Sequence, residues 1–182
     1  MVGDIESNPG PESAYISSTR LSAVDILFDK FISICNINIR RKRNKINFLQ
    51  NVVDEFGIIV LTETHFNTSI ENRDNELDSF ADKNHQRKDR TNSGCGLIIY
   101  SKEDIGICRK HELENDIDET IMVEVHAKVH SFLLCNTYRP QWTDTEYWAR
   151  LSHAIGLAYQ VNKNIVISGD LNADLMSLNN NN

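Results

Sequence analysis

The chain has 182 residues, 40% of them apolar, which suits one domain with a sufficient core. Its 26 acidic and 19 basic residues give a net charge of −7, which excludes a protein that grips nucleic acid by bulk positive charge. No apolar run approaches membrane-spanning length, no secretory signal is visible, and the four cysteines form no Cys-x-x-Cys pair. We therefore expect an intracellular protein, cytoplasmic or nuclear, with no membrane partner and reduced thiols.

The first eleven residues are rich in turn formers and end on Asn8-Pro9-Gly10-Pro11. The segment 3–11 resembles the core of 2A ribosome-skipping peptides, which implies a junction between Gly10 and Pro11. Only Met1 and Val2 precede this core, whereas that family has a longer helical stretch upstream, so we interpret it as a relic. Residues 12–30 show no periodicity and are predicted to be a linker.

A strand, a helix and a second strand follow the linker. Residues 31–38 form an apolar run that ends on amide side chains. Residues 44–56 carry apolar residues at helical spacing and predict an amphipathic helix, which Gly57 ends. The next apolar run, 57–62, is followed at once by Glu63.

The middle of the chain alternates polar and apolar segments. Residues 67–93 are polar throughout and predict a loop region with at most a short helix. Residues 95–101 and 119–127 are predicted strands, and the alternation in the second indicates that it is half-exposed. A further strand is predicted for 130–138, which leads into Arg139.

The last predicted elements are a helix and a strand. Residues 143–146 have the pattern of a capping box and open a helix whose apolar face contains Trp148, Leu151, Ile155 and Ala158. The β-branched run 165–167 indicates a buried strand, and Gly169 allows a tight turn before Asp170. The tail 179–182 is all asparagine and is not expected to fold.

Four predicted strands thus end in polar groups: Asn38, Glu63, Tyr138 with Arg139, and Asp170 with Asn172. Each alone has an ordinary interpretation as a turn. Together they favour one shared site, because carboxylates and amides at strand ends are suited to hold Mg²⁺ or to orient a phosphate. We expect the carboxyl groups of Glu63 and Asp170 to lie within roughly 10 Å of one another.

These motifs resemble, in order, those of the endonuclease/exonuclease/phosphatase superfamily, and more narrowly the apurinic-type endonuclease domain of non-LTR retrotransposons. The matching segments are 38–46, 61–64, 87–100, 138–140 and 169–174. The resemblance implies an α/β fold, a two-sheet sandwich with outer helices. Residues 31–178 would be its N-terminal two thirds, incomplete at the C-terminus. Missing strands would then supply part of the cover for the apolar runs 58–61 and 165–167.

The resemblance also implies roles for the strand-end residues. Glu63 would bind Mg²⁺ (Mn²⁺ is possible) and Asn38 would help to position it, with Asn36 as the competing candidate. Asp170 would orient or deprotonate the attacking water. Asn172 would contact the phosphate, and Tyr138 would supply a phenol beside it.

The implied partner is DNA, with a reverse transcriptase domain expected downstream. Phosphate or DNA contacts are assigned to Arg139, Arg40, Arg43 and Lys45, although a basic cluster of this kind can equally be a solvated loop. None of the six histidines lies in the family's Asp-His setting, and His65 is interpreted as a loop residue. A Mg²⁺-dependent endonuclease, inactive in this form, is therefore favoured; a phosphatase branch acting on a small phosphate ester and a non-catalytic remnant stay open.

Overall fold

The computed structural model describes residues 31–40, 45, 48–50, 55–66, 77, 80, 85–89, 96–126, 131–141 and 145–173. The predictions for the 2A-like residues 1–11, the linker 12–30, Arg43 and the tail 179–182 lie outside these residues. The predicted helix over 44–56 lies mostly outside them, but its described residues 48–50 are helical, and the Leu49 N–H donates to the Lys45 carbonyl at 3.0 Å.

The described residues form two four-stranded sheets. The first has the order β1-β2-β4-β3 and consists of β1 (Ile34–Asn38), β2 (Ile58–Thr62), β3 (His85–Lys88) and β4 (Leu97–Ser101). Strands β1 and β2 are parallel and the other pairs are antiparallel. This pairing brings the C-terminal ends of β1 and β2 to one edge of the sheet, with Asn38 opposite Thr62.

The second sheet has the order β5-β6-β7-β8. Its strands are β5 (Gly106–Arg109), β6 (Glu119–His126), β7 (Ser131–Tyr138) and β8 (Ile165–Asp170), with the short helix η3 (His111–Leu113) before β6 and α2 (Tyr147–Val161) before β8. Strands β7 and β8 are parallel, so Tyr138 lies opposite Asp170 at their C-terminal ends. The connection through α2 is the crossover that a parallel pair requires.

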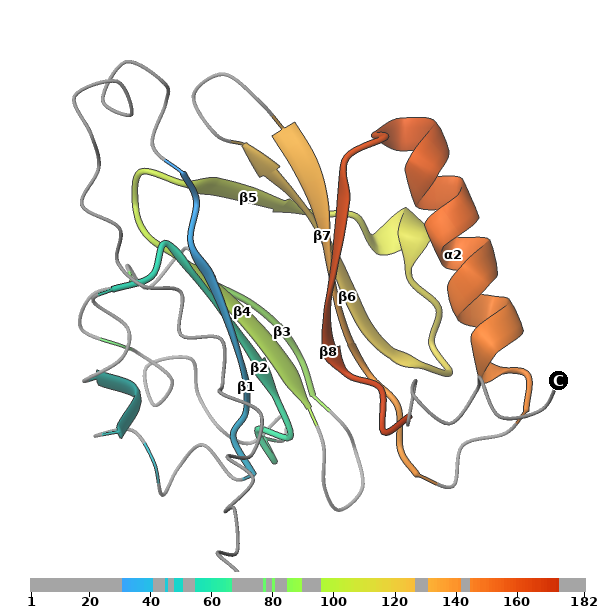
Figure 1. Cartoon of the computed structure of the whole chain (residues 1–182), viewed down its shortest axis with the longest axis horizontal. Helices are drawn as coiled ribbons and strands as arrows, with labels where there is room; N and C mark the ends of the chain where they lie inside the picture. The colour runs from blue at the N-terminus through green and yellow to red at the C-terminus, as the bar shows by residue number, and fades with distance from the viewer. Residues whose placement is uncertain are drawn as a thin grey trace, which may run out of the picture. The chain divides into compact units, whose positions relative to one another are not determined.

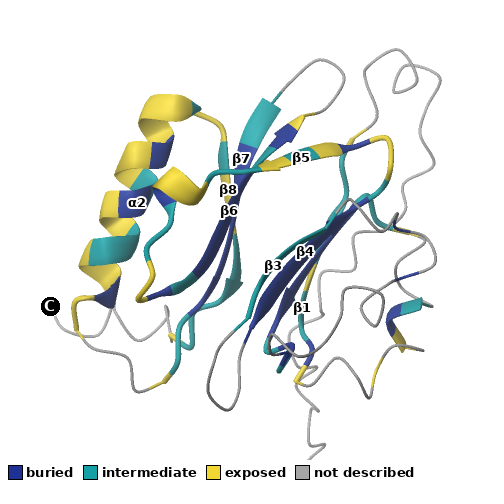
Figure 2. Cartoon of the chain, turned by 180° about the vertical axis from the view of Figure 1, so that it is seen from behind, coloured by how far each residue is buried: buried dark blue, intermediate teal, exposed yellow. Residues whose placement is uncertain are grey.

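The two sheets pack face to face, with α2 on the outer side of the second sheet (Figure 1). Apolar residues of β2 and β4, including Val60 and Ile99, meet those of β6 and β7, including Val123 and Leu134, in one buried cluster. A second cluster covers the outer face of the first sheet, and a third lies between the second sheet and α2. The inner side of α2 is accordingly buried and its outer side exposed (Figure 2). The predicted fold class, an α/β two-sheet sandwich with outer helices, is confirmed.

Three sequence-based predictions about elements are wrong. Residues 85–88, assigned to a loop, form edge strand β3, whose polar side chains make ionic and hydrogen-bonding contacts in place of apolar packing. The segment 119–127 is not half-exposed, because the face that holds Thr120 and Met122 is also buried, with Met122 packed among residues of η3, β7 and α2. Helix α2 begins at Tyr147 and not within the predicted capping box 143–146, since residues 145 and 146 form a turn; residues 143 and 144 lie outside the described residues.

Burial also differs from expectation. Residues 58–61 are fully buried by other residues of this chain, so β2 needs no further cover. In β8, by contrast, Val166 and Ile167 are 39% and 49% exposed. In α2, Trp148 was predicted to lie on the buried face but is 40% exposed. Tyr147 is buried instead. No helix in the described ranges has the length and apolar character needed to span a membrane.

Candidate active site

Side chains from three strand ends meet at one edge of the sandwich. The Asn38 Nδ2 donates hydrogen bonds to Glu63 Oε1 at 2.9 Å and to Asp170 Oδ2 at 2.8 Å. Asn38 ends β1, Glu63 follows β2, and Asp170 ends β8, so the cluster joins the first sheet to the second. One amide group therefore holds two carboxylates from opposite sheets close together, as the strand ends predicted.

The atoms of this cluster that could bind a metal ion are all oxygens. The Asn38 Oδ1 is buried and has no hydrogen-bond partner among the described residues, although the two carboxylates lie beside the same amide. A buried acceptor without a donor is costly, and a cation would satisfy it. Mg²⁺ takes one or two carboxylates with water and phosphate oxygens, so this donor set fits it. Within the described residues, no three His, Cys, Asp or Glu side chains gather in a metal-binding group, so water or substrate would complete the coordination.

Asn36, the competing candidate, has a different neighbour. Its Nδ2 donates to the backbone carbonyl of Gly169 at 3.0 Å, one residue before Asp170. Asn36 thus ties β1 to the backbone of β8, whereas Asn38 contacts the carboxylates.

The backbone around the cluster is strained. Glu63, Asn172 and Arg40 have φ values of 54°, 43° and 40°, in the left-handed region that non-glycine residues seldom adopt. Gly169 has φ 135°, and a Cβ there would lie 1.8 Å from the Thr137 carbonyl oxygen. Strain of this kind persists where surrounding contacts impose it, and it concentrates at functional sites.

The turn after β8 is fixed by hydrogen bonds to β7. The Asn172 N–H donates to Asp170 Oδ1 at 3.0 Å, and the Asn172 side-chain amide donates to the Arg139 carbonyl at 2.7 Å. The Arg139 N–H donates to the Asp170 carbonyl at 2.9 Å. Both oxygens of Asp170 thus accept hydrogen bonds from asparagines, which fixes the direction of this carboxylate.

Arg139 and Tyr138, both predicted to lie beside the phosphate, make contacts with other residues of the chain. The Arg139 guanidinium lies over the rings of Trp148 and Tyr147, at 5.3 and 5.8 Å from the ring centroids, and Nη1 donates to the Asn172 carbonyl at 3.3 Å. Burial raises the pKa of Tyr147, whose hydroxyl hydrogen-bonds with Thr137. Tyr138 is 8% exposed and packs in the core between the sheets.

Of the remaining predicted residues, only His65 has a contact with the cluster in the described part of the chain. Arg40 directly follows buried Ile39 and is exposed, as is Lys45. His65, interpreted as a loop residue, lies in the loop after β2, with Nε2 3.9 Å from Glu63 Oε2. The structure therefore places an imidazole ring beside the Glu63 carboxylate.

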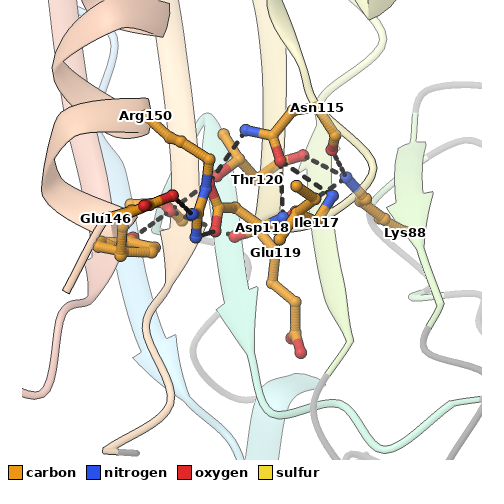
Figure 3. A network of polar contacts seen from close by, with 10 residues as sticks. Lys88, Asn115, Ile117, Asp118, Glu119, Thr120, Glu146 and Arg150 are labelled. Carbon is orange, nitrogen blue, oxygen red and sulfur yellow. Dashed lines mark hydrogen bonds and ion pairs between the residues drawn. The ribbon is translucent and has the colours of Figure 1, made fainter. Parts of the chain in front are cut away.

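Two features were not singled out from sequence. Asn136 is fully buried in β7 and donates to the Leu61 carbonyl at 3.1 Å, across the space between the sheets. A polar network around Asp118 links β3, the segment before β6 and α2 (Figure 3). The available signal for Asn136 was an amide inside the apolar strand 131–138; nothing in the spacing of Lys88, Asp118 and Arg150 indicates their contact.

Residues 34–182 match the profile of the Endonuclease/Exonuclease/phosphatase family, and the chain belongs to this family. The fold is similar to the endonuclease domain of TRAS1, a telomere-specific non-LTR retrotransposon, at 12% identity and TM-score 0.55 over 80% of this chain and 62% of that one. It is also similar to the AP endonuclease LMAP from Leishmania major, at 13% identity and TM-score 0.60 over 78% and 55%.

A third similar structure is the 3′ phosphatase NExo from Neisseria bound to product DNA hairpin, at 13% identity and TM-score 0.52 over 78% of this chain and 58% of that one. At these identities the similarity establishes the fold. The chain spans less than two thirds of the length of each of these proteins. No protein of curated function matches it in sequence.

Proposed function

We propose that this chain is a divalent-metal-dependent phosphodiesterase acting on DNA, an endonuclease domain of the non-LTR retrotransposon type. The observation that carries the proposal is the convergence of Asn38, Glu63 and Asp170 from both sheets on one amide nitrogen. Two carboxylates held this close repel each other, and a bound cation removes the repulsion.

In this proposal Glu63 and the unpaired Asn38 Oδ1 hold Mg²⁺, with Mn²⁺ as a possible replacement. A metal ion held by these residues would supply the positive charge that neutralises the non-bridging oxygens of the phosphate. Asp170, fixed by Asn38 and the Asn172 N–H, orients the attacking water and accepts its proton. Asn172 acts mainly by holding this turn, because its side chain is bonded to the Arg139 carbonyl.

DNA as substrate is supported by the relatives, which include a retrotransposon endonuclease domain and a phosphatase bound to a DNA hairpin. With a net charge of −7, the chain would bind the DNA backbone by local contacts from Arg40, Arg43 and Lys45. Arg139 stabilises the turn after Asp170 through the hydrogen bond from Nη1 to the Asn172 carbonyl, and its guanidinium stacks over the Trp148 ring. The retrotransposon assignment further proposes a downstream reverse transcriptase domain as a partner.

A second candidate is phosphomonoester hydrolysis, favoured by the similarity to a 3′ phosphatase. The same carboxylates and metal would serve it, since both reactions need a positioned water and a neutralised phosphate. The two candidate reactions differ in their substrate: an endonuclease cleaves a phosphodiester within the DNA strand, whereas a phosphatase removes a terminal phosphate.

The test uses the full chain with three DNA substrates: supercoiled plasmid, an oligonucleotide with an abasic site, and a hairpin with a 3′-phosphate. If the chain hydrolyses DNA in this form, Glu63→Gln should lower its Mg²⁺-dependent strand cleavage by at least about 10²-fold. Release of phosphate from the hairpin without strand cleavage would favour the phosphatase. Cleavage that Glu63→Gln leaves unchanged would contradict both, and no hydrolysis of any substrate would favour a non-catalytic remnant.

A further inference from the structure

Asn136 is a buried amide that faces the opposite sheet. It is 0% exposed and lies two residues before the end of β7, opposite Ile121 of β6 and Ser168 of β8. Its neighbours two residues away, Leu134 and Tyr138, belong to the core between the sheets. Its side chain therefore points away from α2 and toward the first sheet.

The amide contacts the first sheet where two of its strands separate. The Asn136 Nδ2 donates to the Leu61 carbonyl at 3.1 Å and to the Ile98 carbonyl at 3.5 Å. Leu61 and Ile98 form the last pair between β2 and β4. Beyond them, β2 continues to pair with β1, and among the described residues the next backbone hydrogen bond toward the β4 side is donated by the Thr64 N–H to the Gly96 carbonyl.

This separation lies directly before Glu63. Leu61 precedes Glu63 by two residues, and Glu63 has the left-handed φ of 54°. A non-glycine residue keeps this conformation only when the backbone on both sides is fixed. Asn136 fixes the preceding side, whereas the bond from Thr64 to Gly96 fixes the following side.

The amide is also only half satisfied. Its Oδ1 is buried and finds no partner in the part of the chain that the structure describes. An apolar side chain of similar volume would avoid this cost, so stability alone does not account for an asparagine here. Its distinctive contribution is the pair of hydrogen bonds that it donates to the Leu61 and Ile98 carbonyls. These bonds connect β7 to the end of β2, and β7 is itself paired with β8, the strand that ends at Asp170.

We propose that Asn136 is a positioning residue: by joining β7 to the ends of β2 and β4, it sets the direction of Glu63 relative to Asp170 and thereby the affinity of the site for divalent metal. This inference rests on the proposed function. A residue that orients a metal ligand without touching the metal contributes about 10–100-fold to metal affinity.

The test compares Asn136→Leu with Thr137→Val in the full chain. Thr137 is the next residue of β7 and equally buried, but its hydroxyl contacts Thr120 and Tyr147 rather than the first sheet. Mn²⁺ affinity is measured by calorimetric titration and by electron paramagnetic resonance of bound Mn²⁺, and folding by thermal melting. We expect Asn136→Leu to weaken Mn²⁺ binding by about 10–100-fold and Thr137→Val to lower the melting temperature without changing Mn²⁺ affinity.

Equal Mn²⁺ affinity in wild type and Asn136→Leu would overturn the inference, as would an equal loss in Thr137→Val. If Asn136→Leu does not fold, Asn136→Ser, whose hydroxyl is too short to reach β2, is measured in the same way. Failure of both to fold while Thr137→Val folds would assign Asn136 to the fold alone and overturn its positioning role. If wild type itself binds no Mn²⁺, the proposed function fails; if wild type binds and the variants match it, only this inference fails.

Discussion

Two polar clusters link the sheets at the same end of the sandwich, and they differ in how completely their atoms are paired. In the site cluster, two carboxylates share the amide of Asn38, whose own oxygen is unpaired among the described residues. In the second cluster, Arg150 binds Asp118 through two hydrogen bonds of 2.9 and 2.7 Å, and opposite charges balance.

The second cluster is saturated around its cations (Figure 3). The Lys88 Nζ donates to the carbonyls of Asn115, Asp118 and Thr120 at 2.8, 3.0 and 3.4 Å. The side-chain oxygen of Asn115 accepts from the Asp118 N–H at 2.7 Å, which closes the loop on itself. A network in which each cation is paired stabilises one arrangement, whereas an incompletely paired cluster of like charges costs stability and is kept where a ligand completes it. The comparison therefore separates a structural crosslink from a binding site.

The site cluster depends on the close approach of β7 and β8 at Gly169. Gly169→Ala would place a Cβ 1.8 Å from the Thr137 carbonyl oxygen at a φ of 135°, so we expect a loss of stability above about 4 kcal/mol. Gly156→Ala is the matched control, because a Cβ added at this exposed position of α2 would meet nothing within 4 Å, and it should stabilise the chain by up to about 1 kcal/mol. Urea unfolding measures both. A tolerated Gly169→Ala would show that β8 can shift without disturbing Asp170.

The saturated cluster should behave as a buried ion pair. Asp118 is 6% exposed, so Asp118→Ala leaves Arg150 without its carboxylate and should cost about 3 kcal/mol of unfolding free energy. Glu146→Ala, which removes the exposed carboxylate 3.9 Å from the same guanidinium, should change stability by less than about 0.5 kcal/mol. Equal losses of unfolding free energy in the two variants would mean that the buried ion pair of Asp118 is no stronger than the exposed contact of Glu146.

Lys88→Met removes three hydrogen bonds but retains the alkyl chain, and should cost about 1–2 kcal/mol at neutral pH. Burial lowers the pKa of Lys88 from 10.5, so between the lowered pKa and 10.5 the folded chain binds fewer protons than the unfolded chain. The stability of wild type relative to Lys88→Met should therefore rise with pH in that window. The exposed Lys163→Met should show neither effect, and urea unfolding at neutral and alkaline pH compares them.

Much of the fold could be predicted because apolar runs mark buried strands. The run before Glu63 became β2 with ends within a residue of expectation, whereas the run 165–167 became β8, which continues three residues further, through the predicted turn at Gly169 to Asp170. Strand β3 could not be predicted, because an edge strand held by polar contacts has no apolar period. The start of α2 was also missed, because residues 145 and 146 form a turn and the helix begins at Tyr147.

The gathering of Asn38, Glu63 and Asp170 followed from strand ends that parallel pairing brings to one edge. Their shared amide nitrogen and the left-handed backbone of Glu63 could not be predicted, because both depend on how one sheet sits on the other. The contact between Asn136 and Leu61 depends on the same packing, over a separation of 75 residues. The catalytic roles of these residues stay predictions.

The central claim is that the incompletely paired cluster is built for a cation, and thermal melting of wild type and Glu63→Gln with and without Mn²⁺ tests it most directly. The glutamine side chain would keep an oxygen for the Asn38 amide but remove one of two repelling charges. Without metal, Glu63→Gln should therefore melt higher than wild type, by about 1 kcal/mol or roughly 2–4 °C. With Mn²⁺ at about 100 times its dissociation constant, wild type should gain about 2.7 kcal/mol and melt higher than the variant. A Glu63→Gln chain that melts below wild type without metal, with no gain for wild type from Mn²⁺, would contradict the account.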